Sequence, residues 1–395
     1  MKYCFHCRLP WEYRSPSRLV LVAISLLWSA STAFAQPQPS DFQYLGSFAI
    51  AGDPSVDPNP YAYGQRGLAL DPSDGGLWIT GHDHRAQVLK VAIPAPSMSK
   101  EWKDLPVAPV LVAPRDFMAS CPSDGDWHFG AIEFFNGRLD GICKYGYNVS
   151  GLDLDTFHRG SASGTATEGP FHVGSRKNRF HSARVGAYLF TIPKEWAEEV
   201  GLGSKRMVTG FARPAGAFGG SQGPTMIAFD PDSPRDAQDL VWYRTNYPSC
   251  PYNGGCDYPE YTACDSWESA TWVNTVKGDG ILIAGIKGLG PTRYGTGDPG
   301  DCSSNQGYHC DPLEIQIIFY DPEAIATALR GKGKPWEILP YAVWRPSDLW
   351  SETCASIGGM AFDAKNQLLY LVEKSASPYG KAVIHTYGVG ETPRR

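Results

Sequence analysis

Short apolar runs recur along the chain in groups, and turn residues separate the runs within each group. The spacing is clearest at the two ends of the sequence, where the runs are Arg66–Asp71, Leu77–Thr80, Val88–Ile93 and Pro109–Val112, and then Gly359–Asp363, Leu368–Val372 and Val383–Tyr387. Groups of four such runs, repeated around a closed ring, are typical of β-propeller blades. The pattern therefore predicts an all-β fold, a single β-propeller.

The middle of the chain holds further groups of the same kind. A run at 128–134 turns at Asn136-Gly137, a strong hairpin signal, into a run at 139–143. We expect that 187–192 and 207–211 complete this blade, and that 225–245 forms an incomplete repeat. A full set follows, with runs at 270–275, 280–284, 315–320 and 341–344. The pattern predicts five clear blades, and six or seven if 150–185 and 213–270 contain weak strands.

The last group shows only three strands, so its fourth strand must come from elsewhere. Residues 43–50 provide an apolar run that would close the ring and remove exposed sheet edges. A β-sandwich or two small β domains are the alternatives, but no linker-like stretch follows Pro39, which favours one closed unit. The predicted segments are an N-terminal piece at 36–42, a propeller domain at 43–390, a tail at 391–395, and short helices near 194–200 and 323–329.

The connections between runs differ in length in a regular way. When the strands of a blade are numbered outward from the axis, the connections between first and second strands are short, at 72–76, 136–137, 277–280 and 364–367. Long connections fall between second and third strands and between blades, at 148–186, 288–313, 51–65, 115–127, 246–269 and 346–356. In an up-and-down blade both long classes emerge on one face, and loops on a rigid scaffold commonly carry function. We therefore expect the site on that face, around the axis.

The N-terminus has the features of a secretory signal peptide. Residues 19–35 form an apolar run that Arg14 and Arg18 precede, and Ala33-Phe-Ala35 fits a small-x-small cleavage site. The run is too short for a membrane span. We therefore predict a signal peptide at 1–35 and a secreted or periplasmic protein without a membrane span.

Eight cysteines follow the predicted cleavage point: Cys121, Cys143, Cys250, Cys256, Cys264, Cys302, Cys310 and Cys354. An even number in an exported chain predicts disulfides, whose pairing the sequence leaves open. We expect Cys302 and Cys310 to staple one loop. Zinc at Cys250, Cys256 and Cys264 is the alternative, which the absence of a CxxC pair disfavours.

Composition and charge narrow the possible partners. The net charge is −6 with no long run of either sign, whereas a nucleic-acid partner would require a concentrated basic stripe. The 43 Gly, 32 Pro and 12% aromatic residues suit a turn-rich, exported β protein. We expect a monomer that binds a carbohydrate or another small ligand.

Polar side chains at the start of first strands or the end of second strands should line the mouth of the axial channel. Near the reacting sugar we predict Arg66, His82, His128 and Tyr145. As substrate-binding residues we predict His84, Tyr147, His181, Arg184, Glu268, Lys287 and Glu373, and equivalent positions hold Lys144 and Lys374. Aromatic faces can stack on pyranose rings, while Arg and Lys pair with carboxylate or sulfate groups. The set indicates a carbohydrate, and an acidic one in particular.

Three kinds of catalysis fit these residues. A Tyr or His base beside a cation that neutralises a uronate carboxylate suits β-elimination. Glu268 and Glu373 are the best placed carboxylate pair for glycoside hydrolysis. His82 and His84 share a strand face and, with His128, would suit a metal in the central channel for lactone or ester hydrolysis.

Several familiar signals are missing or weak. The sequence has no GxSxG elbow, no GxGxxG after a strand, no P-loop and no HExxH. The acidic turn Gly297–Asp301 lacks EF-hand spacing, so an ordinary solvated turn is favoured over calcium. No cofactor is firmly implied, beyond the metal in the channel that one alternative requires.

The C-terminal phrases Pro335–Tyr341, Gly359–Asp363 and Leu368–Glu373 resemble secreted bacterial propeller proteins without a characterised member. The resemblance implies the propeller fold and brings no catalytic residue with it. We predict a propeller that acts on an anionic polysaccharide, as a lyase or a glycoside hydrolase, although the sequence leaves open whether it is an enzyme. The alternatives are a non-catalytic glycan- or protein-binding propeller and a metal-dependent lactone or ester hydrolase.

Overall fold

The computed structural model describes the chain in eleven segments: 36–50, 65–81, 86–118, 127–145, 154–176, 185–211, 221–243, 261–351, 354–374, 376 and 381–390. By their contacts they belong to one unit, Ala35–Arg395. The predicted signal peptide at 1–35 and the tail at 391–395 lie outside the described residues.

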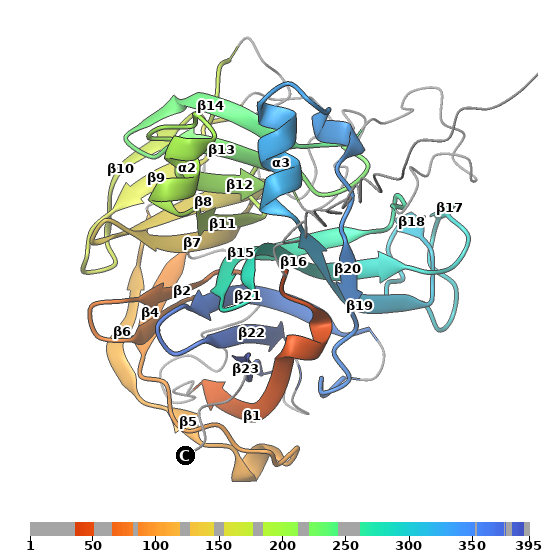
Figure 1. Ribbon diagram of the computed structural model, residues 1–395. Coiled ribbons are helices and arrows are strands. Elements are labelled where there is room, and N and C mark those ends of the chain that lie inside the picture. Colours follow the sequence, from red (N-terminus) through yellow and green to blue (C-terminus); the bar gives the residue numbers. More distant parts are fainter. Residues whose placement is uncertain are drawn as a thin grey trace, which may run out of the picture. The chain divides into compact units, whose positions relative to one another are not determined.

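Five sheets follow one another along the chain, each built on four antiparallel strands in radial order, and one of them carries β5 (Val107–Ala108) as an additional parallel edge strand (Figure 1). The first blade contains β2 (Leu68–Asp71), β3 (Gly76–Thr80), β4 (Gln87–Val91) and β6 (Val110–Asp116). The second contains β7 (Trp127–Phe135), β8 (Arg138–Tyr145), β9 (Phe157–Gly160) and β10 (Ala166–Phe171). The third contains β11 (Tyr188–Thr191), β12 (Met207–Gly210), β13 (Met226–Asp230) and β14 (Ser233–Val241). The fourth contains β15 (Ser266–Thr275), β16 (Gly278–Gly288), β19 (Leu313–Tyr320) and β20 (Ala342–Trp344).

The fifth blade closes the ring with a strand from the other end of the chain. Its strands are β21 (Ser356–Asp363), β22 (Leu368–Lys374), β23 (Val383–Val389) and β1 (Phe42–Ile50). β1 pairs antiparallel with β23, from Phe42 opposite Val389 to Ala49 opposite Val383. The innermost strands contact one another in the order β2, β7, β11, β15, β21 and back to β2. The predictions of one five-bladed propeller and of closure by the N-terminal run are confirmed.

The second and third blades divide differently from the sequence prediction. The sequence pattern places 187–192 and 207–211 in the second blade, but they form β11 and β12, the inner strands of the third. β9 and β10 complete the second blade instead, and 225–245 supplies the outer half of the third. β10 lies at the sheet edge, where proline is tolerated. Its alternating apolar pattern is weak because Gly169-Pro170 interrupts it.

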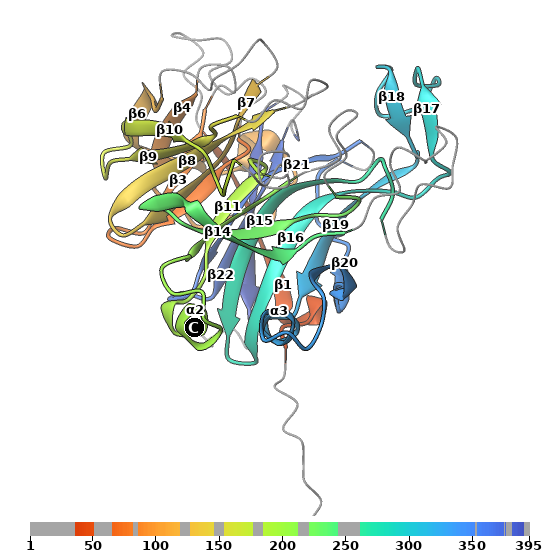
Figure 2. The same cartoon turned by 90° about the horizontal axis from the view of Figure 1, so that it is seen from above.

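Loop lengths follow the predicted sidedness, with two differences. The predicted 148–186 connection is not one long loop, because it contains β9 and β10. Turns between first and second strands are short in four blades, but in the third this connection contains α2 (Lys194–Glu199). α3 (Pro322–Leu329) lies between the third and fourth strands of the fourth blade, where Asp321 caps its start by accepting the Glu323 N–H. Figure 2 shows α2 and α3 at one end of the ring and the β17–β18 hairpin at the other. Both predicted helices are confirmed.

Apolar side chains fill the space between neighbouring blades. Trp78, Phe117 and Phe129 belong to a buried cluster between the first and second blades. The remaining described elements are β5 (Val107–Ala108), β17 (Arg293–Gly295), β18 (Gly307–His309), and the 3-10 helices η1 (Pro39–Asp41), η3 (Trp102–Asp104) and η4 (Pro335–Glu337). Within the described residues, none of the helices has the length and apolar character that crossing a bilayer requires.

Candidate functional site

The inner strand of the fourth blade has an irregularity at Glu268. Along the β15–β16 ladder, Trp267 pairs with Gly285 and Ser269 pairs with Ala284, so Glu268 is the extra residue of a β-bulge. Bulges redirect a side chain and are frequent next to functional sites. The local backbone of β15 therefore sets the direction of the Glu268 carboxylate.

Glycines occupy the corresponding irregularities of two other blades. The β7–β8 ladder shifts register around Gly130, and the β21–β22 ladder shifts around Gly359. A Cβ on Gly130 would lie 1.8 Å from the carbonyl oxygen of Gly186, and one on Gly359 would lie 2.4 Å from the amide nitrogen of Leu68. The inner strands approach too closely for a side chain at these positions. Among these three bulges, Glu268 alone carries a long polar side chain.

Basic side chains from two other blades bind the Glu268 carboxylate. Nη1 of Arg66, just before β2 in the first blade, lies 3.1 Å from Oε2, and Nζ of Lys144, on β8 in the second blade, lies 2.7 Å from the same oxygen. Ser266 Oγ donates to Oε1 at 2.6 Å. The Arg66, Lys144 and Glu268 side chains are only 16, 15 and 11% exposed. Three blades therefore meet at one largely buried carboxylate.

The electrostatics keep Glu268 ionised. Burial would raise its pKa, because a low-dielectric environment disfavours the charged form. The positive charges of Lys144, Arg66 and Lys374 outweigh burial and hold the pKa well below its usual range. Lys374 ends β22, so the fifth blade also contributes charge. Glu268 is a carboxylate at physiological pH and has no proton to donate as a general acid.

A second ion pair lies in the same blade. Nζ of Lys287 is 2.8 Å from Oδ2 of Asp265, which also accepts the N–H and hydroxyl of Thr262 and the N–H of Gly288. Burial raises the pKa of Asp265, although Lys287 opposes the rise. Asp265 holds the end of β16 against the loop that enters β15. Thus Lys287, a predicted substrate-binding residue, already has a structural partner.

Glu373, the other predicted carboxylate, has a different environment. Its Oε2 accepts from His385 Nε2 at 2.9 Å and from the Trp350 N–H at 2.8 Å, and its Oε1 accepts the Ser351 N–H at 2.8 Å. Burial would raise its pKa, but these bonds and the His385 ring hold it below its usual value. The contacts anchor the loop before β21 to the fifth blade. None of the described contacts joins Glu373 to Glu268.

His128 lies beside the lysine that binds Glu268. On the β7–β8 ladder, His128 is paired with Lys144, and the next pair is Phe129 with Cys143. Phe129 and Cys143 belong to the core between the first and second blades, so His128 and Lys144 project from the opposite face of the sheet. The Tyr145 backbone ends β8, but its side chain is outside the described part. Also outside are the predicted residues His82, His84, Tyr147, His181 and Arg184.

Two contributors to this region were missed by sequence reasoning. Asp265 holds Lys287, and Ser266 donates to Glu268. Both directly precede the bulge, so a polar Asp-Ser pair entering an apolar strand is the sequence signal that could have found them.

Two disulfides correct the cysteine prediction. Cys302 is bonded to Cys354 and Cys264 to Cys310, so Cys302 and Cys310 do not pair with each other. Each bridge joins the 288–313 loop to a connection between blades on the same face. The bridge at Cys264 contradicts zinc binding there. Cys143 is also disulfide-bonded, and Cys121, Cys250 and Cys256 lie outside the described segments.

A cavity of about 700 Å³ lies between the fourth blade and the connection that leads to β21. Ile286, Glu314, Arg345, Trp350 and Cys354 are part of its lining. Arg345 Nε is 2.9 Å from a carboxylate oxygen of Glu314, so the polar wall contains an ion pair. The cavity borders the loop that Glu373 anchors, and it contains no predicted site residue.

Metal-binding capacity lies away from the axis. Among the described residues, Asp301, His309 and Asp311 are the only group of three or more whose ligand atoms lie close enough together for one metal ion. They belong to the long loop of the fourth blade. The predicted channel metal rests on His82 and His84, outside the described residues, and on His128, and it stays a prediction.

Comparisons with known proteins give matches in overall fold only. No protein-family model and no curated protein matches the chain. A solved glycosyl hydrolase from Bacteroides ovatus is 11% identical, with a TM-score of 0.38, and the match covers 82% of this chain and 84% of that one. A solved exo-1,5-α-L-arabinanase from a bovine ruminal metagenomic library is 10% identical, with a TM-score of 0.44, and the match covers 84% of this chain and 98% of that one. The function must therefore be argued from this chain's own residues.

Proposed function

We propose that the protein binds an anionic polysaccharide at the Glu268 cluster and cleaves it by β-elimination. The observation that carries the proposal is the gathering of Arg66, Lys144 and Lys374, from three blades, around one ionised carboxylate. The three cations lie at strand ends on the face with the long connections. Arg and Lys side chains are the groups that pair with a uronate carboxylate or a sulfate.

The cluster has groups suited to each requirement of β-elimination. The proton next to a uronate carboxylate is lost more easily when positive charge stabilises the carbanion that develops. Arg66 offers a planar guanidinium that matches a carboxylate, and Lys144 offers a compact charge. His128, the cross-strand neighbour of Lys144, accepts the proton at C5, and the C4–O bond breaks. The oxygen leaves on C1 of the other fragment and takes up a proton, and a C4–C5 double bond remains in the uronate that becomes the new non-reducing end. Tyr145 and His82 remain further candidates for the proton transfers.

We assign Glu268 to positioning rather than to proton abstraction. A carboxylate whose pKa is held far below the working pH is a weak base. The negative charge of Glu268 instead holds the Arg66 and Lys144 side chains, which come from different blades, beside the same carboxylate oxygen. Hydrolysis by Glu268 and Glu373 is less well supported, because both oxygens of Glu373 are bonded to its own blade and loop.

The test is a panel of uronate-containing polysaccharides, followed by ultraviolet absorbance of the unsaturated product and by a reducing-end assay. Wild-type protein should produce both signals together. Lys144→Met should lower kcat/KM by about 100-fold, the scale of losing one group that stabilises developing charge. Lys277→Met is the matched control. Lys277 is half-exposed and lies in the turn that joins β15 to β16, at the opposite end of these strands from Glu268, where it pairs with Asp41.

The possible outcomes separate the alternatives. Reducing ends without unsaturated product would indicate hydrolysis. Binding without turnover, lost in Lys144→Met, would indicate a glycan-binding propeller. Neither binding nor turnover on any acidic polysaccharide would overturn the proposal.

A further inference from the structure

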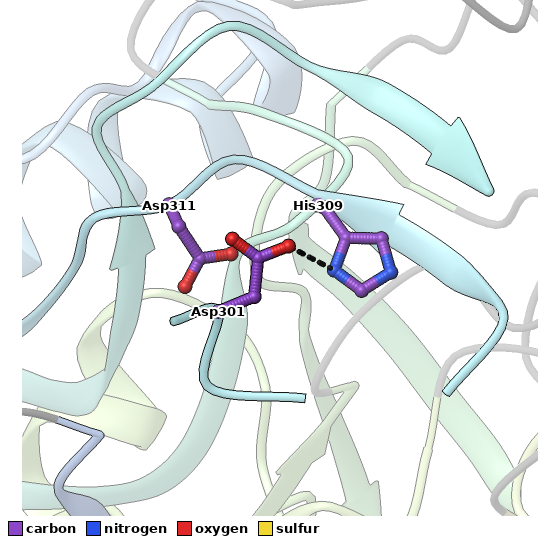
Figure 3. A group of neighbouring side chains, drawn as sticks. All are labelled: Asp301, His309 and Asp311. Atoms are coloured by element: carbon purple, nitrogen blue, oxygen red, sulfur yellow. Dashed lines mark ion pairs between the residues drawn. The ribbon is translucent and has the colours of Figure 1, made fainter. Parts of the chain in front are cut away.

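The connection between β16 and β19 brings three potential metal ligands together. Asp301 lies in the loop of the β17–β18 hairpin, His309 ends β18, and Asp311 follows two residues later. One ligand atom from each lies within 4.8 Å of the other two. Figure 3 shows the Asp301 and Asp311 carboxylates facing each other, with the His309 ring beside Asp301.

The hydrogen-bond partners of His309 indicate which of its two ring nitrogens carries hydrogen. Nε2 lies 3.1 Å from the Gly295 carbonyl oxygen and 3.0 Å from that of Asn305. Both are acceptors only, so Nε2 must carry hydrogen, and in the neutral ring Nδ1 presents its lone pair. Nδ1 points at Asp301 Oδ2, 3.5 Å away, and the side chain is 4% exposed. A buried nitrogen lone pair and a carboxylate oxygen that face each other repel unless a proton or a metal ion lies between them. Metal-binding histidines commonly donate their other N–H to a backbone carbonyl in this way.

The two carboxylates are held facing one another despite their charge. Asp301 Oδ2 accepts from Arg293 and from the Asp298 N–H at 2.7 Å, while Asp311 Oδ1 accepts the Cys302 N–H at 3.0 Å. Arg293 is shared with the exposed carboxylate of Asp298. One arginine therefore cannot neutralise the cluster, and a divalent cation would.

Covalent links hold the ligands in position. Cys302, the neighbour of Asp301, is bonded to Cys354, and Cys310, between His309 and Asp311, is bonded to Cys264. The two bridges tie the segments that carry the ligands to separate parts of the ring. A site prepared in this way loses little chain entropy when an ion binds.

We propose that Asp301, His309 and Asp311 form a zinc site that locks the β17–β18 hairpin. One imidazole and two carboxylates form the three-ligand protein set of a tetrahedral zinc centre, whose fourth position is open to solvent. Calcium prefers six to eight oxygen ligands, so an imidazole ligand argues against it. The site is separate from the Glu268 cluster and does not depend on the proposed catalysis.

The experiment uses the full folded protein, stripped with a chelator and titrated with zinc or calcium by calorimetry, followed by elemental analysis after dialysis. Wild-type protein should bind one zinc at this site, bind calcium at least about 10-fold more weakly, and unfold at a higher temperature with zinc. Asp311→Asn keeps an acceptor for the Cys302 N–H but loses the charge, and its zinc affinity should fall at least about 10-fold. Asp298→Asn is the matched control, because Asp298 shares Arg293 but is not a ligand.

The outcomes decide the proposal in either direction. Equal zinc binding by wild type, Asp298→Asn and Asp311→Asn would overturn it, as would an absence of zinc binding by wild type at 100-fold molar excess. If Asp311→Asn fails to fold, His309→Gln takes its place, with disulfide content and near-ultraviolet circular dichroism as the checks on folding. Preference for calcium would reject the assignment of the metal.

Discussion

Glu268 and Glu373 are both buried carboxylates, and both have pKa values held below the usual range. They differ in the origin of the groups that hold them. Glu268 is bound by side chains of the first and second blades, whereas Glu373 is bound by His385 and backbone amides of its own blade and loop. Glu268 therefore couples blades through charge, and Glu373 fastens a loop. This difference is the residue-scale reason for locating the site at Glu268.

Glu268→Gln should lower the free energy of unfolding by about 3 kcal/mol at neutral pH, because Arg66 and Lys144 would remain largely buried without their counter-charge. The folded pKa of Glu268 lies below the unfolded value of about 4.3. The stabilisation is therefore fully present above that value and is lost as the pH falls through the folded pKa. The difference between wild type and variant should shrink in acid. Urea unfolding over a pH series measures it.

The control for this series is Glu323→Gln on α3. Glu323 is 64% exposed and pairs with Arg330, so its loss should change stability by less than about 1 kcal/mol. A Glu268→Gln deficit that stayed constant into strong acid would show that packing, rather than charge, is what the variant removes.

At the scale of elements, the inner strands β7 and β11 meet at Glu133. Thr191 Oγ1 donates to Glu133 Oε1 at 2.9 Å across the boundary between the second and third blades. Burial raises the pKa of Glu133 to about 8, with the Thr191 bond opposing the rise and the charge of Asp140 adding to it. The blade interface therefore contains an acid that is neutral at physiological pH.

Glu133→Gln should stabilise the protein at mildly alkaline pH. The unfolded chain releases this proton above about pH 4.3, while the folded chain keeps it up to about pH 8. Wild-type stability therefore falls as the pH rises through that window and levels off above it. Glutamine cannot ionise and still accepts from Thr191, so the variant should gain up to roughly 5 kcal/mol near the top of the window, at about 1.4 kcal/mol for each pKa unit, and nothing at its acid end. Thermal unfolding at stepped pH measures the gain.

Glu168→Gln is the control for this prediction. Glu168 lies on β10 of the same blade, is 57% exposed and pairs with Arg159. Its removal should leave the pH profile unchanged. A gain in Glu133→Gln that did not vary with pH would mean that the proton on Glu133 is not its source.

The sequence predicts elements that are determined by residues close together in the chain, but not contacts between residues that are far apart in it. Strands with alternating apolar residues and the Asn136-Gly137 turn are set by neighbours in sequence, and they were predicted. β10 was not, because Gly169-Pro170 interrupts its pattern. The disulfide pairing and the contact between Lys144 and Glu268, 124 residues apart, depend on which loops and blades become neighbours. Strand order indicated that both side chains lie at one face, but not that they touch.

At the scale of the whole molecule, the ring depends on the pairing of its first and last strands. β1 and β23 form an antiparallel ladder with one shift of register between Tyr44 and Gly46, and beyond it the Gly390 N–H donates to the Asp41 carbonyl at 3.0 Å. The outer side of β1 is partly covered by β5, which pairs with it in parallel. Without β1, the apolar strand β23 would present an unpaired edge, which favours association with other chains.

This closure predicts opposite fates for two rearranged chains. Deleting 36–50 should yield protein that self-associates and lacks a single cooperative unfolding transition.

A circular permutant, with a short linker from 390 to 41 and new ends at the Asn136-Gly137 turn, keeps every strand and makes β23–β1 a covalent hairpin. Because the linked ends already lie side by side, the permutant should stay monodisperse and unfold within about 2 °C of wild type, a shift of about 1 kcal/mol. Size-exclusion chromatography and thermal circular dichroism distinguish the two chains. A deletion variant that remained monodisperse with wild-type unfolding would show that the four other blades suffice without this closure.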